Sequence, residues 1–176
     1  MTDRDTQRSK VYDAERLVRA MFDNANSSSR REVQIHGSTL TLPIERRFAS
    51  TESVQDYVDR VLALNWVQRT WPEAKSPVTV RRRAGQRAAH YEPTTATIAV
   101  PPGKPGEDWA MRELVILHEL AHHLAPQAPN GAHSSSDSPH GPAFLGRLLT
   151  LVSELIGAEA AFVLRSTLHD CGAQEG

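Results

Sequence analysis

The spacing of apolar residues predicts four helical regions. Apolar side chains recur every three or four positions over residues 9–23 and again over residues 54–64, so each segment is expected to form an amphipathic helix. The segment from about residue 107 to Pro126 is apolar nearly all round, which is typical of a buried helix. Its two acidic residues at 107 and 108 are expected in the first turn, where they suit the helix dipole. Pro142 predicts the start of another helical region.

Alternation of apolar and polar residues predicts short strands between these helices. Residues 33–42 indicate a hairpin that turns at Gly37 and Ser38. Residues 78–83, 87–91 and 95–100 predict three further strands, the second of which returns beside the first. The order of elements predicts an α+β domain with a small antiparallel or mixed sheet and with N- and C-terminal helices.

Composition narrows the class of protein. A chain of 176 residues with 39% hydrophobic residues and a net charge of −1 is expected to fold as one cytoplasmic domain without membrane spans. Cys171 is the only cysteine, which excludes an intrachain disulfide and a cysteine-based metal cluster. Residues 1–8 are expected to be frayed, and residues 125–139 to form a flexible loop. Nothing in the sequence indicates the oligomeric state.

Residues 118–122 read H-E-L-A-H and lie in the third predicted helix. Residues four apart project from one helical face, so His118 and His122 are expected to bind one zinc ion at about 2.0–2.1 Å. A bound zinc lowers the pKa of its water to about 7. Glu119, one position on, is placed to act as the general base toward that water. The motif therefore predicts a zinc-dependent hydrolase.

A catalytic zinc needs a third protein ligand. His123 points about 100° away from His122 and is disfavoured. His140 is favoured, because it directly precedes the Gly-Pro turn that opens the next helix. The other candidates are His133, Asp137, Glu154 and Glu159.

The H-E-L-A-H segment, a loop and then H-G-P-A-F at residues 140–144 resemble SprT-like and WLM-type zinc metallopeptidases, and in particular small metallohydrolases of actinobacteria. The resemblance implies a zincin-like fold and hydrolysis of a peptide or protein substrate. It also implies that the strand before the motif helix, residues 95–100, pairs with extended substrate. The matching positions are His118, His122 and His140 for zinc and Glu119 for catalysis. The segment is similar as well to the ImmA/IrrE type, in which a glutamate on a later helix is the third ligand; Glu154 or Glu159 would fill that role.

Two other functions stay open. Clustered arginines could form a phosphate-binding stripe and bring a SprT-like protease to nucleic acid; they are Arg30, Arg31, Arg46, Arg47, Arg81, Arg82, Arg83 and Arg87. Alternatively, a structural metal could hold two helices of a non-catalytic domain together. In the enzyme, His123 and Tyr91 are candidate donors to the oxyanion. The three tryptophans are expected in the core.

Overall fold

The computed structural model divides into two compact units, and each combines helices with strands. Unit 1 comprises Met1–Glu45 and Asp137–Gly176, and unit 2 comprises Arg46–Ser136. The structure describes residues 5–85, 88–101, 109–127 and 138–176. The mixture of helices and small sheets confirms the predicted α+β class, whereas the single domain stays a prediction. No helix in these described ranges is long and apolar enough to cross a membrane.

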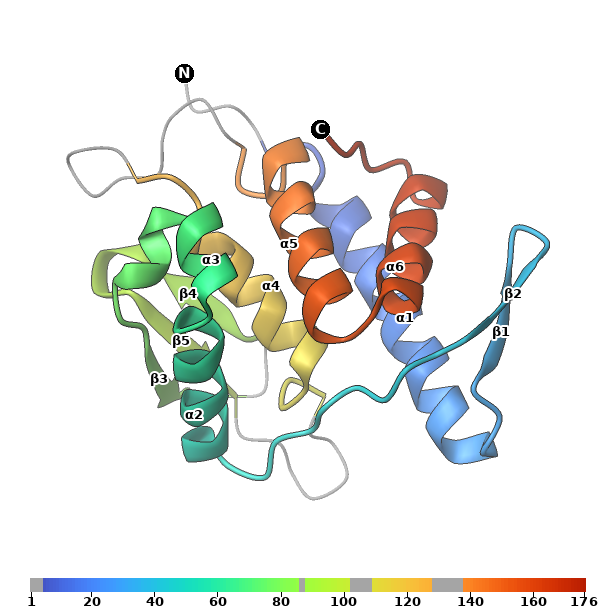
Figure 1. Cartoon of the computed structure of the whole chain (residues 1–176), viewed down its shortest axis with the longest axis horizontal. Coiled ribbons are helices and arrows are strands. Elements are labelled where there is room, and N and C mark those ends of the chain that lie inside the picture. Colours follow the sequence, from blue (N-terminus) through green and yellow to red (C-terminus); the bar gives the residue numbers. More distant parts are fainter. Residues whose placement is uncertain (1–4, 86–87, 102–108, 128–137) are drawn as a thin grey trace. The chain divides into compact units, whose positions relative to one another are not determined.

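Unit 1 is built on three helices, α1 (Arg8–Ser28), α5 (Pro142–Leu155) and α6 (Ala158–Asp170). Helix α6 packs against both α1 and α5 (Figure 1). Most of the apolar stripe predicted for the first helix is buried, although Leu17 is 43% exposed; the buried members include Val11, Ala14, Val18 and Phe22. Helix α5 begins at Pro142 as predicted, because the missing amide hydrogen of proline costs nothing in the first turn.

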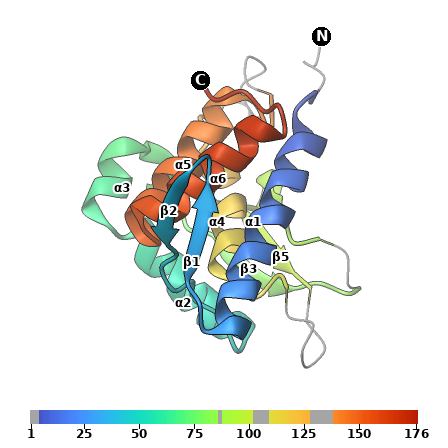
Figure 2. The same cartoon turned by 90° about the vertical axis from the view of Figure 1, so that its right-hand side faces the viewer.

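A hairpin completes unit 1 and is formed by β1 (Glu32–Ile35) and β2 (Ser38–Thr41), whose antiparallel arrows are visible in Figure 2. Its two turn residues are His36 and Gly37, with φ of 49° and 79°. Two-residue hairpin turns of type I′ need positive φ at both central positions, and glycine adopts such angles without strain. The turn therefore lies one residue earlier than predicted, and Ser38 begins the second strand.

Unit 2 holds a three-stranded sheet and the motif helix. Its elements are α2 (Thr51–Leu62), α3 (Asn65–Thr70), a 3-10 turn (Pro72–Lys75), β3 (Thr79–Arg82), β4 (His90–Glu92), a second 3-10 turn (Pro93–Thr95), β5 (Thr97–Val100) and α4 (Glu113–His123). Helix α2 begins earlier than predicted, because Ser50 and Ser53 cap it reciprocally. The prediction that the tryptophans lie in the core is wrong, because Trp66 and Trp71 are half-buried and Trp109 is 37% exposed.

The strand order in this sheet is β3-β5-β4, with β3 parallel and β4 antiparallel to β5. The sheet is mixed, as predicted, but β4 does not return beside β3. It pairs with β5 instead, through the tight 3-10 turn between them and the left-handed Ala96 (φ 45°). All four residues of β5 are buried, which suits an apolar strand with a neighbour on each side.

The central position of β5 overturns the prediction that residues 95–100 pair with an extended substrate, because both of its edges are occupied. Part of the outer edge of β3 is occupied by a side chain. The side-chain amide of Gln55 on α2 donates to the carbonyl of Val78 at 2.8 Å and accepts from the amide of Val80 at 2.6 Å. Within the described ranges, no strand pairs with the outer edge of β4.

Candidate metal centre

The N-terminus of the motif helix α4 is set by a contact that is distant in sequence. Arg112 holds the N-cap position without a side-chain cap hydrogen bond, and it forms an antiparallel bridge with Arg47. Beside this bridge, the amide of Glu113 donates to the carbonyl of Arg46 at 3.0 Å. Helix α4 therefore begins at Glu113 and not near residues 107 and 108, which lie outside the described residues.

Glu113 is a buried carboxylate that connects the start of α4 to α2 and to the segment just before α2. Its Oε1 accepts from Arg46 Nη1 at 2.7 Å and from the Tyr57 hydroxyl at 2.6 Å, and its Oε2 accepts from the Arg46 amide at 3.0 Å. The hydrogen bond to Glu113 raises the pKa of Arg46. Burial, and next the nearby Glu113 charge, raise the pKa of Tyr57. Sequence analysis missed this anchor, although a lone acidic residue at the start of an apolar helix is its signal.

His118 and His122 converge from successive turns of α4. Their Nε2 atoms are 3.2 Å apart, and their ring centroids are 5.0 Å apart. Two nitrogens that bind one tetrahedral zinc at about 2.05 Å lie about 3.3 Å from each other, so this pair fits a zinc ion. Glu119, the predicted general base, is buried on the same helix.

His123 faces away from this pair and fastens α4 to the sheet. Its Nδ1 lies 2.9 Å from the Tyr91 hydroxyl on β4, and its Nε2 lies 3.1 Å from the carbonyl of Ser76. The carbonyl can only accept, so Nε2 carries the hydrogen and Nδ1 accepts from Tyr91. Burial lowers the pKa of His123 and raises the pKa of Tyr91 to about 12. The Tyr91 hydroxyl hydrogen and the His123 Nε2 hydrogen are thus both used in these bonds. Neither side chain can therefore be the oxyanion donor that the sequence suggested.

Of the third-ligand candidates, His140, Glu154 and Glu159 belong to unit 1 and are described. His140 is buried just before α5, whereas the two glutamates are exposed on α5 and α6. Exposure is the ordinary state of a solvated carboxylate and favours His140 over both. His133 and Asp137 lie outside the described residues. His140 as the third ligand stays a prediction.

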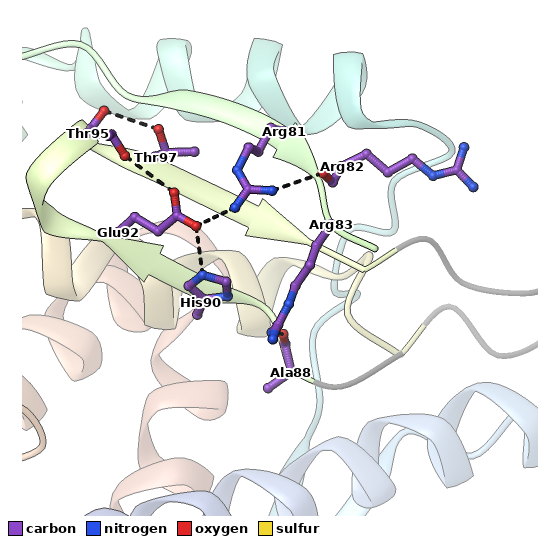
Figure 3. Close-up of polar contacts among 8 residues, drawn as sticks. All are labelled: Arg81, Arg82, Arg83, Ala88, His90, Glu92, Thr95 and Thr97. Atoms are coloured by element: carbon purple, nitrogen blue, oxygen red, sulfur yellow. Dashed lines mark hydrogen bonds and ion pairs between the residues drawn. The ribbon is translucent and has the colours of Figure 1, made fainter. Parts of the chain in front are cut away.

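Arg81 and Arg83 have side-chain contacts within the sheet region, whereas the exposed side chain of Arg82 points away from these residues (Figure 3). Arg81 pairs with Glu92, which also contacts His90 Nε2 at 2.9 Å. Arg83 donates to the carbonyl of Ala88 at 2.6 Å. The hydrogen bond from Arg81, and next the one with His90, lower the pKa of Glu92.

Two other members of the predicted phosphate-binding stripe also contact oxygens of their own unit. Arg31 donates to the carbonyls of Leu42 and Pro43, and Arg46 donates to Glu113. Arg87 lies outside the described residues. These contacts stabilise the fold and give the stripe no support.

Comparison with protein-family models finds no match to this chain, and searches of curated proteins and of solved structures find none either. The function must therefore be inferred from the residues and their geometry.

Proposed function

We propose that this chain is a zinc-dependent hydrolase that cleaves peptide bonds in a peptide or protein substrate. The observation that carries the proposal is the 3.2 Å separation of His118 Nε2 and His122 Nε2 on a buried helix that also bears Glu119. A zincin-like fold is part of the proposal. The packing of α4 against β4 of a mixed sheet supports it.

His118 and His122 would hold the ion through their Nε2 atoms, and His140 is the proposed third ligand. When bound, zinc supplies a Lewis acid that lowers the pKa of its water to about 7. Glu119 would take the proton from this water and return it to the leaving amine. The anchors at Glu113 and His123 hold the two ends of α4, so they fix the helix that presents the ligand pair and the base.

The substrate would bind along β4. Among the described residues, no strand pairs with the outer edge of β3 or of β4, but the side chain of Gln55 already occupies backbone groups at the edge of β3. An extended peptide that pairs with a strand edge gains main-chain hydrogen bonds without a demand on side-chain identity. This placement replaces the expectation that β5 receives the peptide.

Metal analysis of the purified chain tests the centre. We expect about one zinc per chain, lost in His122→Ala and kept in the matched control His169→Ala, whose side chain is exposed on α6. A spacing of 3.2 Å also suits a single N–H···N hydrogen bond between two metal-free imidazoles. A wild-type chain that binds no zinc would support that arrangement and overturn the proposal.

Hydrolysis of labelled unstructured casein tests the chemistry. Glu119→Gln is expected to keep zinc and to lose about 10²–10⁴-fold in rate, the usual contribution of a general base. Zinc bound at full occupancy without any hydrolysis by the wild type would instead indicate a structural metal. Equal rates for the wild type and Glu119→Gln would reject the role of the glutamate. The nucleic-acid alternative has less support, because Arg31, Arg46, Arg81 and Arg83 contact oxygens of the fold.

A further inference from the structure

His140 is held by the N-terminal segment of its own unit. Its Nδ1 lies 2.6 Å from Asp5 Oδ2, although the two residues are 135 positions apart in sequence. Gln7 donates from its side-chain amide to the carbonyl of His140 at 3.2 Å. The imidazole also packs against the rings of Tyr12 and Phe144, with centroid distances of 5.3 and 5.1 Å. Side chain and backbone of His140 are thus both fixed.

The contact with Asp5 decides which nitrogen of His140 can bind a metal. A carboxylate accepts hydrogen bonds, so Nδ1 carries the hydrogen in this contact and the lone pair of a neutral ring is on Nε2. The same atom, Nε2, is the one that His118 and His122 bring together on α4. Metal-binding histidines commonly donate their other ring nitrogen to a carboxylate, which fixes the ring and raises its basicity.

Other histidine–carboxylate pairs in the described chain are built differently. His36 contacts Asp170 at 3.0 Å and His90 contacts Glu92 at 2.9 Å, and both histidines use Nε2 for this contact. The side chains of His36 and His90 are 55% and 39% exposed, whereas that of His140 is 7% exposed. The His140 pair is shorter, more buried and reversed in the nitrogen that it uses. An ordinary surface ion pair explains none of these three differences.

We propose that Asp5 is a positioning residue, which orients the His140 imidazole and directs its Nε2 lone pair to zinc. This inference rests on the proposed function, and on His140 as the third ligand. It gives a role in the metal centre to the polar segment before α1.

The test is zinc affinity, measured by competition with a chromophoric chelator for the wild type, His140→Ala, Asp5→Ala and Asp5→Asn. Loss of a partner that orients a ligand typically weakens metal binding about 10–100-fold, and this is expected for Asp5→Ala. Asp5→Asn should lose less, because its amide oxygen still accepts from Nδ1. Asp170→Asn is the matched control: it alters the His36 pair in the same unit and should bind zinc like the wild type.

A second readout separates orientation from general stability. In ¹⁵N NMR spectra of the zinc-free protein, His140 should carry its hydrogen on Nδ1 in the wild type and in Asp5→Asn, and should shift toward the Nε2–H form in Asp5→Ala. Unchanged affinity and an unchanged tautomer in Asp5→Ala, together with zinc loss in His140→Ala, would overturn the role of Asp5 alone. Wild-type affinity in His140→Ala would place the third ligand elsewhere and overturn this inference, while zinc loss in His122→Ala would still uphold the proposed function. A wild type without zinc would overturn both.

Discussion

The buried carboxylate of Glu113 offers a quantitative test of how α4 is held. Three hydrogen bonds reach it, two from Arg46 and one from Tyr57. Hydrogen bonds to a charged group contribute about 1.5–3 kcal/mol each, and neutral ones about 0.5–1.5 kcal/mol. Glu113→Gln makes the bonds from the Arg46 backbone amide and the Tyr57 hydroxyl neutral and leaves the charged Arg46 guanidinium with a neutral acceptor. It also turns an NH₂ group toward at least one donor, so the total loss amounts to about 3–4 kcal/mol.

Part of this loss is offset. The Arg46 side chain is 59% exposed, so its guanidinium can return to water when the carboxylate is gone. The net decrease in the free energy of unfolding should therefore be about 2–3 kcal/mol for Glu113→Gln. Tyr57→Phe removes one of the three bonds and should cost about 1–2 kcal/mol. The double mutant should lose less free energy of unfolding than the sum of the two single losses, because both changes act on one hydrogen bond.

Urea unfolding followed by circular dichroism gives these energies. Asp13→Asn is the matched control, since it removes an exposed ion pair with Arg16 and should change the free energy of unfolding by less than about 0.5 kcal/mol. If Glu113→Gln were as stable as this control, the carboxylate would not anchor α4. Additive losses in the double mutant would show that Tyr57 and Glu113 act separately.

Other contacts in unit 2 give further expectations. Between pH 10 and about 12 the unfolded chain loses the Tyr91 phenol proton while the folded chain keeps it, so the free energy of unfolding should fall by about 1.4 kcal/mol per pH unit. Tyr91→Phe should remove this contribution. If urea titrations gave the wild type and Tyr91→Phe the same dependence of unfolding free energy on pH, the raised pKa would be contradicted. Gln55→Ala leaves the Val78 carbonyl and the Val80 amide without their side-chain partner, at a cost of about 1–3 kcal/mol. The exposed strand edge should also promote aggregation, which light scattering detects. A variant that stays monomeric and fully stable would refute the role of Gln55 in edge protection. The ionised Glu92 carboxylate stabilises the fold above pH 4.5, its ordinary pKa, and this stabilisation is lost as the pH falls through its lowered pKa in the folded protein. The difference in unfolding free energy between the wild type and Glu92→Gln should therefore close over this pH range. A difference that persists in acid would exclude the ionised carboxylate as its cause.

The features that sequence predicted well are those governed by local geometry. The convergence of His118 and His122 follows from their four-residue spacing on a helix, and the start of α5 follows from the conformation of Pro142. The hairpin was also predicted, but its turn was displaced by one residue, because glycine can supply either of the two positive φ angles.

Features that depend on distant segments were missed or misplaced. The predicted return of β4 beside β3 was wrong, since the choice of neighbour depends on burial from both sides and not on alternation within the strand. The start of α4 depends on a bridge to Arg47, which lies 65 positions before Arg112 in the printed sequence. The contact between Asp5 and His140 has no local signature at all.

Hydrogen bonding agrees with spacing on the two adjacent histidines of α4. His122 lies four residues from His118, and the sequence disfavours His123 as a ligand because it points about 100° away. Both nitrogens of His123 are engaged, by Tyr91 and by the carbonyl of Ser76, so it has no lone pair left for a metal. Nε2 of His122 is directed instead at Nε2 of His118. Because the two rings lie on different faces, the helix presents the two proposed ligands on one side, and His123 fixes the helix to the sheet on the other.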